Sequence, residues 1–153
     1  MRRLWLLLLA AGIAAADQAT KALALAGLEA GRSVPVIPGF FDLTLAFNSG
    51  AAFSSFANWQ HAPLLLMAAS GLAILVAGWL MLTIRDNGLL AAALALILGG
   101  AAGNLIDRAR LGSVVDFVDL YHGVWHFPVF NLADSAITVG GVAAAIMLLK
   151  NKG

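Results

Sequence analysis

The sequence contains no cysteine, and this absence excludes several kinds of chemistry at once. The chain can form no disulfide, offer no thiol nucleophile and hold no metal through thiolates. Charged residues are also scarce, at 11% of the 153 residues, whereas about 25% is usual in soluble domains. The formal net charge of +1 gives no reason to expect a nucleic-acid partner or a strongly acidic one.

Familiar catalytic signatures are missing too. No serine lies in a Gly-x-Ser-x-Gly elbow. His122 and His126 have the spacing of helical metal ligands, but Gly123 lies between them and no His-Glu-x-x-His motif accompanies them, so a zinc site is disfavoured. No glycine-rich loop follows a strand to cradle a phosphate. We therefore expect no cofactor and no metal, and hydrolysis by this chain would need aspartates.

Apolar residues, by contrast, make up 61% of the chain and gather in four long runs. The predicted transmembrane helices cover approximately residues 4–26, 63–84, 89–106 and 130–149. At 1.5 Å per residue each reaches roughly 30 Å, which is enough for a bilayer core. We expect an all-α integral membrane protein with one membrane-embedded domain (1–153), a four-helix bundle with loops at 29–62 and 107–129. The pattern does not determine the secondary structure of 111–125.

The first helix has a second interpretation. Arg2-Arg3, the apolar run and the small residues Ala14-Ala15-Ala16 also describe a cleavable signal peptide, but apolar character resumes after Lys21 and favours a span. An even number of spans keeps both termini on one side, and a slim excess of Lys and Arg favours the cytoplasm. The inner side would hold Arg2, Arg3, Arg85, Lys150 and Lys152, and the outer side Lys21, Arg32, Arg108 and Arg110.

The first outer loop carries a strand pattern. Phe41, Leu43, Leu45 and Phe47 alternate with more polar or smaller residues, and Asn48-Ser49-Gly50 is typical of a turn. We expect a small extracytoplasmic β-sheet that rests on the membrane or covers a groove. A short interfacial helix is predicted from Ser54 to His61, with Phe56 and Trp59 at membrane depth.

Polar residues interrupt three of the four spans at one depth. Asp17 and Lys21 are four residues apart and can pair on one helix face. The third helix ends on Asn104, Asp107 and Arg108, and the fourth begins with a stripe of Asn131, Asp134, Ser135 and Thr138. Hairpin topology brings these groups together in the outer half of the membrane.

Each of these groups also has a purely structural interpretation. Asp17 and Lys21 neutralise each other and are better explained as a structural pair. Gly99, Gly100 and Gly103 are typical of close helix packing. The amides of Asn104 and Asn131 can serve as helix glue or as site residues, and Asp107 and Arg108 can be interface anchors or site residues.

Asp116 and Asp134 are the two carboxylates hardest to explain structurally. An ionisable group near hydrocarbon is costly, so it indicates a functional site. Asp116 is flanked by Val114, Val115, Phe117 and Val118, and Asp134 lies early in a span with no adjacent Lys or Arg. Two neighbouring carboxylates push their pKa values apart and support acid–base chemistry. A small transporter or proton relay and a purely structural subunit remain the alternatives.

Five sequence blocks resemble a known family. They are Asp17-Gln18-Ala19-Thr20-Lys21, Phe47-Asn48-Ser49-Gly50-Ala51-Ala52-Phe53, Gly99-Gly100-Ala101-Ala102-Gly103-Asn104-Leu105-Ile106-Asp107-Arg108, Gly112-Ser113-Val114-Val115-Asp116-Phe117 and Phe130-Asn131-Leu132-Ala133-Asp134-Ser135. In this order and spacing they resemble the bacterial lipoprotein signal peptidases (signal peptidase II, aspartic peptidase family A8). The one departure, Ser54 after the second block, is minor.

The resemblance implies a specific activity. It predicts an aspartic endopeptidase of the bacterial inner membrane, with both termini cytoplasmic and an extracytoplasmic site, that removes signal peptides from diacylglyceryl-modified prolipoproteins just before the lipid-modified cysteine. Membrane lipid and a globomycin-type inhibitor are the other implied partners, and a monomer is the default. The implied residues are Asp116 and Asp134 for catalysis, Asn104, Arg108, Asn131, Asn48 and Gly50 for substrate binding, and Asp17, Lys21 and Asp107 for polar support.

Overall fold

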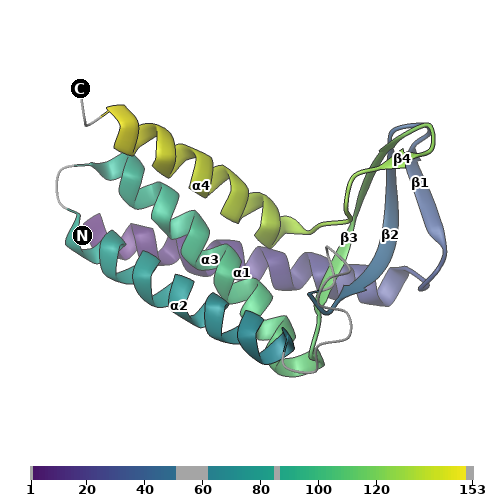
Figure 1. The fold of residues 1–153 in the computed structure, drawn as a ribbon, viewed down its shortest axis with the longest axis horizontal. Coiled ribbons are helices and arrows are strands. Elements are labelled where there is room, and N and C mark those ends of the chain that lie inside the picture. Colours follow the sequence, from purple (N-terminus) through teal and green to yellow (C-terminus); the bar gives the residue numbers. More distant parts are fainter. Residues whose placement is uncertain (1, 51–61, 85–86, 151–153) are drawn as a thin grey trace.

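Four long helices form a bundle with a small antiparallel sheet at one end (Figure 1). The computed structural model describes residues 2–50, 62–84 and 87–150. The elements are α1 (Arg2–Gly27), β1 (Ser33–Ile37), β2 (Phe41–Asn48), α2 (Ala62–Thr83), α3 (Gly88–Leu111), β3 (Val114–His122), β4 (Trp125–His126) and α4 (Leu132–Lys150). Each helix is long and apolar enough to cross a membrane. The predicted four-helix membrane fold with a sheet is therefore confirmed, whereas the helix predicted at 54–61 lies outside the described residues.

Helix α3 is the centre of the bundle and packs against α1, α2 and α4. Two glycines permit the closest approaches. A Cβ on Gly99 would lie 2.5 Å from the carbonyl oxygen of Ala10 in α1, and one on Gly100 would lie 2.5 Å from that of Ala133 in α4. The helix backbones are in contact at these points, in agreement with the packing predicted for this glycine-rich stretch.

The third helix is longer than the predicted 89–106. It continues to Leu111 and ends at Gly112, whose φ of 72° is the left-handed conformation typical of a helix C-cap. The Gly112 N–H donates to the carbonyl of Arg108 at 3.0 Å. The charged turn that was expected to be loop stays helical because Asp107 is buried against partners from α1 and β3. At the other end of α3, the Asn87 side chain caps the helix by accepting from the Leu90 N–H.

The sheet has the strand order β1-β2-β3-β4, with every pair antiparallel. The alternating pattern correctly predicted β2. The segment 107–129, expected as a loop of undetermined structure, instead holds β3 and β4. The β2–β3 register pairs Ala46 with Asp116 and Asn48 with Val114, so it brings the end of β2 alongside Asp116.

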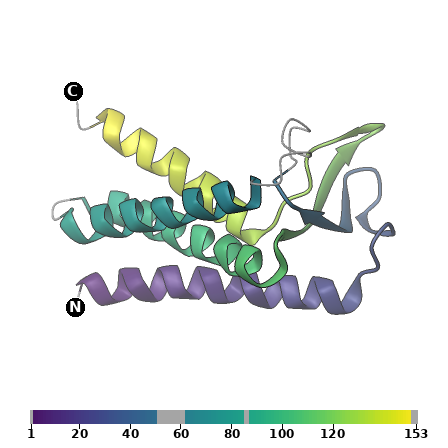
Figure 2. The same cartoon turned by 60° about the horizontal axis from the view of Figure 1, so that its bottom comes forward.

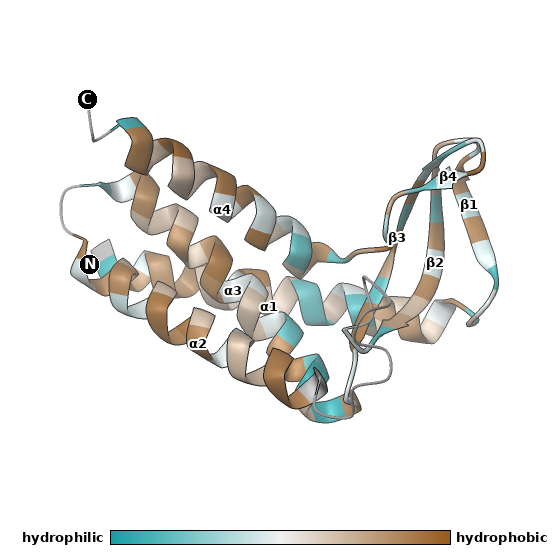
Figure 3. Cartoon of the chain, in the orientation of Figure 1, coloured by the Kyte–Doolittle hydropathy of each residue, from teal (hydrophilic) through white to brown (hydrophobic). Residues whose placement is uncertain are grey.

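The sheet lies at one end of the bundle, and the first and last described residues lie at the other. The start of α1, the end of α2, the start of α3 and the end of α4 are together, away from the sheet (Figure 1). Helix α1 runs the whole length of the bundle and continues beneath the sheet (Figure 2). The helices are mainly hydrophobic, with polar bands where α1, α3 and α4 approach the sheet (Figure 3). The polar residues of three helices therefore gather at the sheet end, as the topology predicted.

Candidate active site

Asn131 caps helix α4 and thereby positions Asp134. Its side-chain Oδ1 accepts from the Asp134 N–H at 2.9 Å, and the Asp134 Oδ2 accepts from the Asn131 N–H at 3.3 Å. This reciprocal pair is a capping box at the first turn of the helix. Asp134, which the sequence left without a structural explanation, therefore has a local structural role as well as its place in the site.

Asp116 lies on β3 and is 1% exposed. Its Oδ1 accepts from Asn131 Nδ2 at 2.6 Å, and its Oδ2 accepts from Asn48 Nδ2 at 3.1 Å. Asn131 thus donates to both carboxylates, to Asp116 through its side chain and to Asp134 through its backbone. The structure brings the two aspartates together around one fully buried asparagine.

Burial, and after it the neighbouring Asp134 carboxylate, raise the pKa of Asp116 to about 6. The hydrogen bonds from Asn48 and Asn131, and then the more distant Lys21 charge, oppose this rise because they stabilise the ionised form. Asp116 is therefore a carboxyl group that retains its proton at a higher pH than an exposed aspartate does.

Asn104 connects Asp134 to Lys21. Its Nδ2 donates to Asp134 Oδ1 at 2.8 Å, while its Oδ1 accepts from Lys21 Nζ at 2.9 Å and from Asn131 Nδ2 at 3.2 Å. An amide whose oxygen faces an ammonium group is polarised and is a stronger donor through its nitrogen. The fixed Asn104 amide therefore orients one oxygen of Asp134.

Lys21 is buried between two carboxylates, at 2.8 Å from Asp17 and 2.8 Å from Asp107. These carboxylates also accept hydrogen bonds from the elements that carry Asp116 and Asp134. Asp17 Oδ1 accepts from the Ala133 N–H in the first turn of α4, and Asp107 Oδ2 accepts from the Val115 N–H beside Asp116. The ion cluster links α1 and α3 to both elements that carry the aspartates.

Gln18 belongs to this support and was missed at the sequence level. Its Nε2 donates to Asp107 Oδ1 at 2.8 Å and to the Gly103 carbonyl at 3.1 Å. Gly103 leaves room for the neighbouring Asp17 carboxylate, which a Cβ at this position would overlap. The signal was available in the sequence, because Gln18 is a polar residue within a span, next to Asp17.

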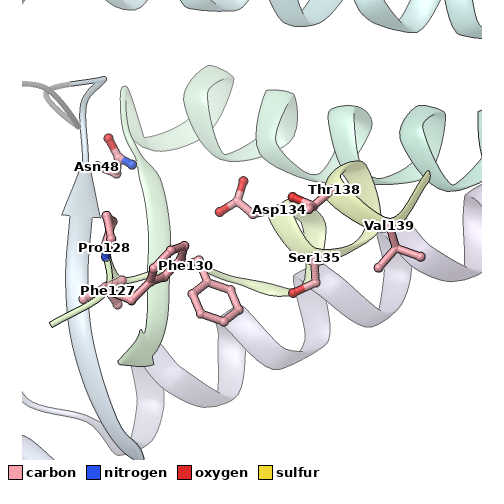
Figure 4. Close-up of a pocket in the computed structure, with 9 residues that line it drawn as sticks. Asn48, Phe127, Pro128, Phe130, Asp134, Ser135, Thr138 and Val139 are labelled. Carbon is pink, nitrogen blue, oxygen red and sulfur yellow. The ribbon is translucent and has the colours of Figure 1, made fainter. Parts of the chain in front are cut away.

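Two cavities meet at Asp134. The larger, of about 530 Å³, lies between the start of α4 and the segment leading into it, and apolar side chains supply much of its wall. Figure 4 shows Asp134, Ser135, Thr138 and Val139 on the α4 side and Asn48, Phe127, Pro128 and Phe130 opposite them. The smaller, of about 300 Å³, lies between α2, α3 and α4 and includes Asn104 and Arg108. Both cavities are accessible to a ligand that contacts Asp134.

Arg108, Asn48 and Gly50 were predicted to contact substrate, and they lie at the borders of these cavities. Arg108 lines the smaller cavity with Asp134, and its Nη1 lies 3.4 Å from Ser70 Oγ. Asn48 lines the larger cavity. Gly50, with a φ of 97°, donates its N–H to Asn48 Oδ1 at 2.9 Å and so holds the Asn48 side chain.

A second polar cluster lies on the sheet, apart from the aspartate pair. Asp119 Oδ1 lies 2.8 Å from His126 Nδ1, and Asp119 Oδ2 accepts from Thr44 at 3.0 Å. The His126 ring also stacks on Tyr121, with 5.0 Å between the ring centroids. His126 therefore links β4 to β3.

The comparisons with known proteins agree with this geometry. A family model described as Signal peptidase (SPase) II matches residues 9–150. A protein named lipoprotein signal peptidase from Azoarcus sp. (strain BH72) is 48% identical over 140 residues, which cover 88% of this chain and 76% of that protein. Another of the same name from Pseudomonas fluorescens (strain Pf0-1) is 48% identical over 153 residues, which cover 97% of this chain and 88% of that protein. A bacterial membrane enzyme solved by the in meso method at 2.3 Å resolution superposes with a TM-score of 0.83 at 32% identity, covering 97% of this chain and 89% of that one.

Proposed function

The chain belongs to the signal peptidase II family, aspartic peptidases that remove signal peptides from lipoproteins, and on this premise we propose that Asp116 and Asp134 are its catalytic pair. The observation that carries the proposal is the position of Asn131, which donates to both carboxylates at the junction of two cavities. Membership of a peptidase family also disfavours the transporter and proton-relay alternative.

The proposed reaction is direct hydrolysis by water. Asp134 takes a proton from the water while the water oxygen bonds to the scissile carbonyl carbon. At the same time Asp116 donates its proton to the carbonyl oxygen. The C–N bond of the resulting gem-diol then breaks. The leaving nitrogen takes the proton from Asp134, and the diol returns a proton to Asp116 as the carbonyl forms again. No covalent intermediate is needed.

Asp116 is assigned the proton because burial and the Asp134 charge raise its pKa to about 6. The titration nevertheless belongs to the pair, so one proton is shared by the two carboxylates in the active state. Arg108 lies in the smaller cavity beside Asp134, where its guanidinium can hold a substrate carbonyl or stabilise charge that develops on oxygen.

We propose that the substrate is a diacylglyceryl-modified prolipoprotein, cut just before its lipid-modified cysteine. The apolar wall of the larger cavity, with Phe127, Phe130 and Val139, suits a substrate that arrives from lipid. Its acyl chains stay in the outer leaflet while the peptide lies against the aspartates. A globomycin-type cyclic peptide would occupy the same cavity.

The proposed location is the bacterial inner membrane, with both termini in the cytoplasm and the sheet and aspartates on the outer side. The helix ends opposite to the sheet lie near Arg3 and Lys150. Counted along the sequence, that side holds five Lys and Arg residues and the sheet side holds four. This bias follows the positive-inside rule, although by a small margin.

The test is cleavage of a diacylglyceryl-modified lipobox peptide by the purified protein, with and without globomycin. Asp116→Asn and Asp134→Asn should each abolish cleavage while the protein still inserts and folds. Asp119→Asn is the matched control, because Asp119 is a buried aspartate on the same strand as Asp116 but its side chain bonds to Thr44 and His126 of the sheet. Substantial cleavage by either variant would overturn the catalytic assignment.

A further inference from the structure

A third cavity lies on α1, apart from both cavities of the site. It is a groove of about 370 Å³ between the last two turns of α1 and the strands β2 and β3. Its lining residues are Thr20, Leu23, Ala24, Gly27, Leu28, Leu43 and Phe117. A volume of this size is within the range of small-molecule sites, roughly 300–1,000 Å³.

The groove has almost no polar surface for water or a polar ligand. Thr20 contributes the only polar side chain among its lining residues. The Thr20 hydroxyl is already used, because it lies 3.0 Å from the Ala16 carbonyl and 2.9 Å from the Asp17 carbonyl of its own helix. A water molecule needs two to four polar partners to be held in a cavity. The chemistry of the groove therefore selects an apolar chain.

The groove shares no lining residue with the two cavities that meet at Asp134. Successive side chains of a strand point to opposite faces. Asp116 is on the face that contacts Asn131, while its neighbour Phe117 lines the groove. On α1, Asp17 and Lys21 are buried in the bundle beside the groove. Strand β3 and the ion cluster thus separate the groove from the aspartates.

The groove is continuous with the surface that α1 presents to lipid. Helix α1 is a candidate membrane span, and Leu23, which lines the groove, is 72% exposed. The 26 residues of α1 extend about 39 Å, beyond a hydrocarbon core of about 30 Å, so its last turns lie at a leaflet boundary. A lipid at that boundary can place one acyl chain in the groove from the side without leaving the bilayer.

We propose that this groove binds one acyl chain of an outer-leaflet phospholipid. The proposal rests on the orientation proposed above only for naming the leaflet. A phospholipid is the chosen occupant because β3 and the ion cluster lie between the groove and the aspartates. The substrate's acyl chains are on the cysteine next to the bond that is cut, so they would be on the aspartate side of this barrier.

The experiment places the protein in nanodiscs of phosphatidylglycerol that carries a photoactivatable group near the end of one acyl chain. Adducts are mapped by mass spectrometry. Gly27→Phe fills the groove, since a Cβ at Gly27 has open space around it and the residue lines the cavity. Gly12→Phe is the matched control, because Gly12 is also an exposed α1 glycine with open space but lines none of the three cavities.

The reference is Leu8, which is on α1 and is 63% exposed. We expect adducts on the groove residues Leu28, Leu43 and Phe117 to exceed those on Leu8, and to fall severalfold in Gly27→Phe but not in Gly12→Phe. The proposal would be overturned if the groove residues were labelled no more strongly than Leu8. It would also be overturned if Gly27→Phe kept the wild-type melting temperature and left the labelling of the groove unchanged. A second arm uses a lipobox peptide with photoactivatable diacylglyceryl chains. Groove adducts from this peptide in place of phosphatidylglycerol would assign the groove to substrate and contradict the proposal. Neither arm needs cleavage, so loss of the catalytic assignment would leave the result readable.

Discussion

The hydrogen bond from Asn48 to Asp116 should set the alkaline limit of activity. Asn48 Nδ2 donates to Asp116 Oδ2 at 3.1 Å and lowers the pKa of this carboxyl relative to the value that burial alone would give. Asn48→Ala removes the donor, so the ionised form loses stabilisation and the pKa of Asp116 must rise. Hydrogen bonds to charged groups contribute about 1.5–3 kcal/mol. Because Asn48 is only half-buried and water replaces part of the bond, we take about 1.4 kcal/mol, which is about one pKa unit.

The consequence for the rate follows from the protonation state that the reaction needs. Activity requires the proton shared by the pair, so kcat/KM falls as the pH rises through the upper pKa of the pair. In the wild type this fall should be centred near the pKa of Asp116, about 6. In Asn48→Ala the same limb should move about one unit to higher pH, even if the maximal rate is lower.

The assay is kcat/KM for a diacylglyceryl lipobox peptide, measured from acidic to alkaline pH. Thr44→Ala serves as the control, since Thr44 is on the same strand and donates to Asp119 instead of Asp116. Its alkaline limb should coincide with that of the wild type. An Asn48→Ala limb that stays in place or moves to lower pH would refute the assignment of the proton to Asp116.

Two further predictions concern the support of the site, and both are measured by thermal unfolding in detergent. Gly103→Ala should destabilise the protein by about 1–3 kcal/mol because its methyl group would overlap the Asp17 carboxylate; Gly78→Ala, whose nearest neighbour would be at 3.8 Å, should not. Equal stability of the two variants would contradict this packing. Lys21→Met should cost about 3–5 kcal/mol, since it leaves two buried carboxylates without their cation. Removing one of them in Lys21→Met/Asp107→Asn should recover part of the loss, and no recovery would count against the ion cluster.

The membrane fold could be predicted because it depends on local composition. A run of apolar residues long enough to cross a bilayer has few structural alternatives, and hairpin topology then fixes which helix ends meet. The convergence of Asp17, Asn104 and Asp134 followed from this argument without any knowledge of tertiary contacts. The strand β2 was predicted for the same reason, since the alternation from Phe41 to Phe47 is a local pattern.

Strand β3 depends on a partner that is distant in the sequence. In β3, residues 114–116 are all buried, so the strand shows no simple alternation from which it could be recognised. Its pairing with β2 joins residues that are about seventy positions apart, such as Ala46 and Asp116. The secondary structure around Asp116 was therefore left undetermined, although its flanking valines had indicated that it was not fully solvated.

Two local signals were present in the sequence and were missed. Asn131 followed three residues later by Asp134 has the form of a capping box, which would have placed the start of α4 at Leu132. Gly112 is a typical C-cap residue and would have extended α3 to Leu111. The role of Asn131 as donor to both aspartates could not be read in this way, because it requires β3 and α4 to meet.

The most direct measurement of the central proposal is a double-mutant cycle on the two aspartates. Cleavage rates of the diacylglyceryl lipobox peptide are compared for the wild type, Asp116→Asn, Asp134→Asn and the double variant. Residues that act as one unit are strongly non-additive. If the two carboxylates share one proton and activate one water, the double variant will cleave no more slowly than either single variant, and all three will be close to the uncatalysed rate. Losses that multiply, or one single variant that retains substantial activity, would contradict the catalytic pair.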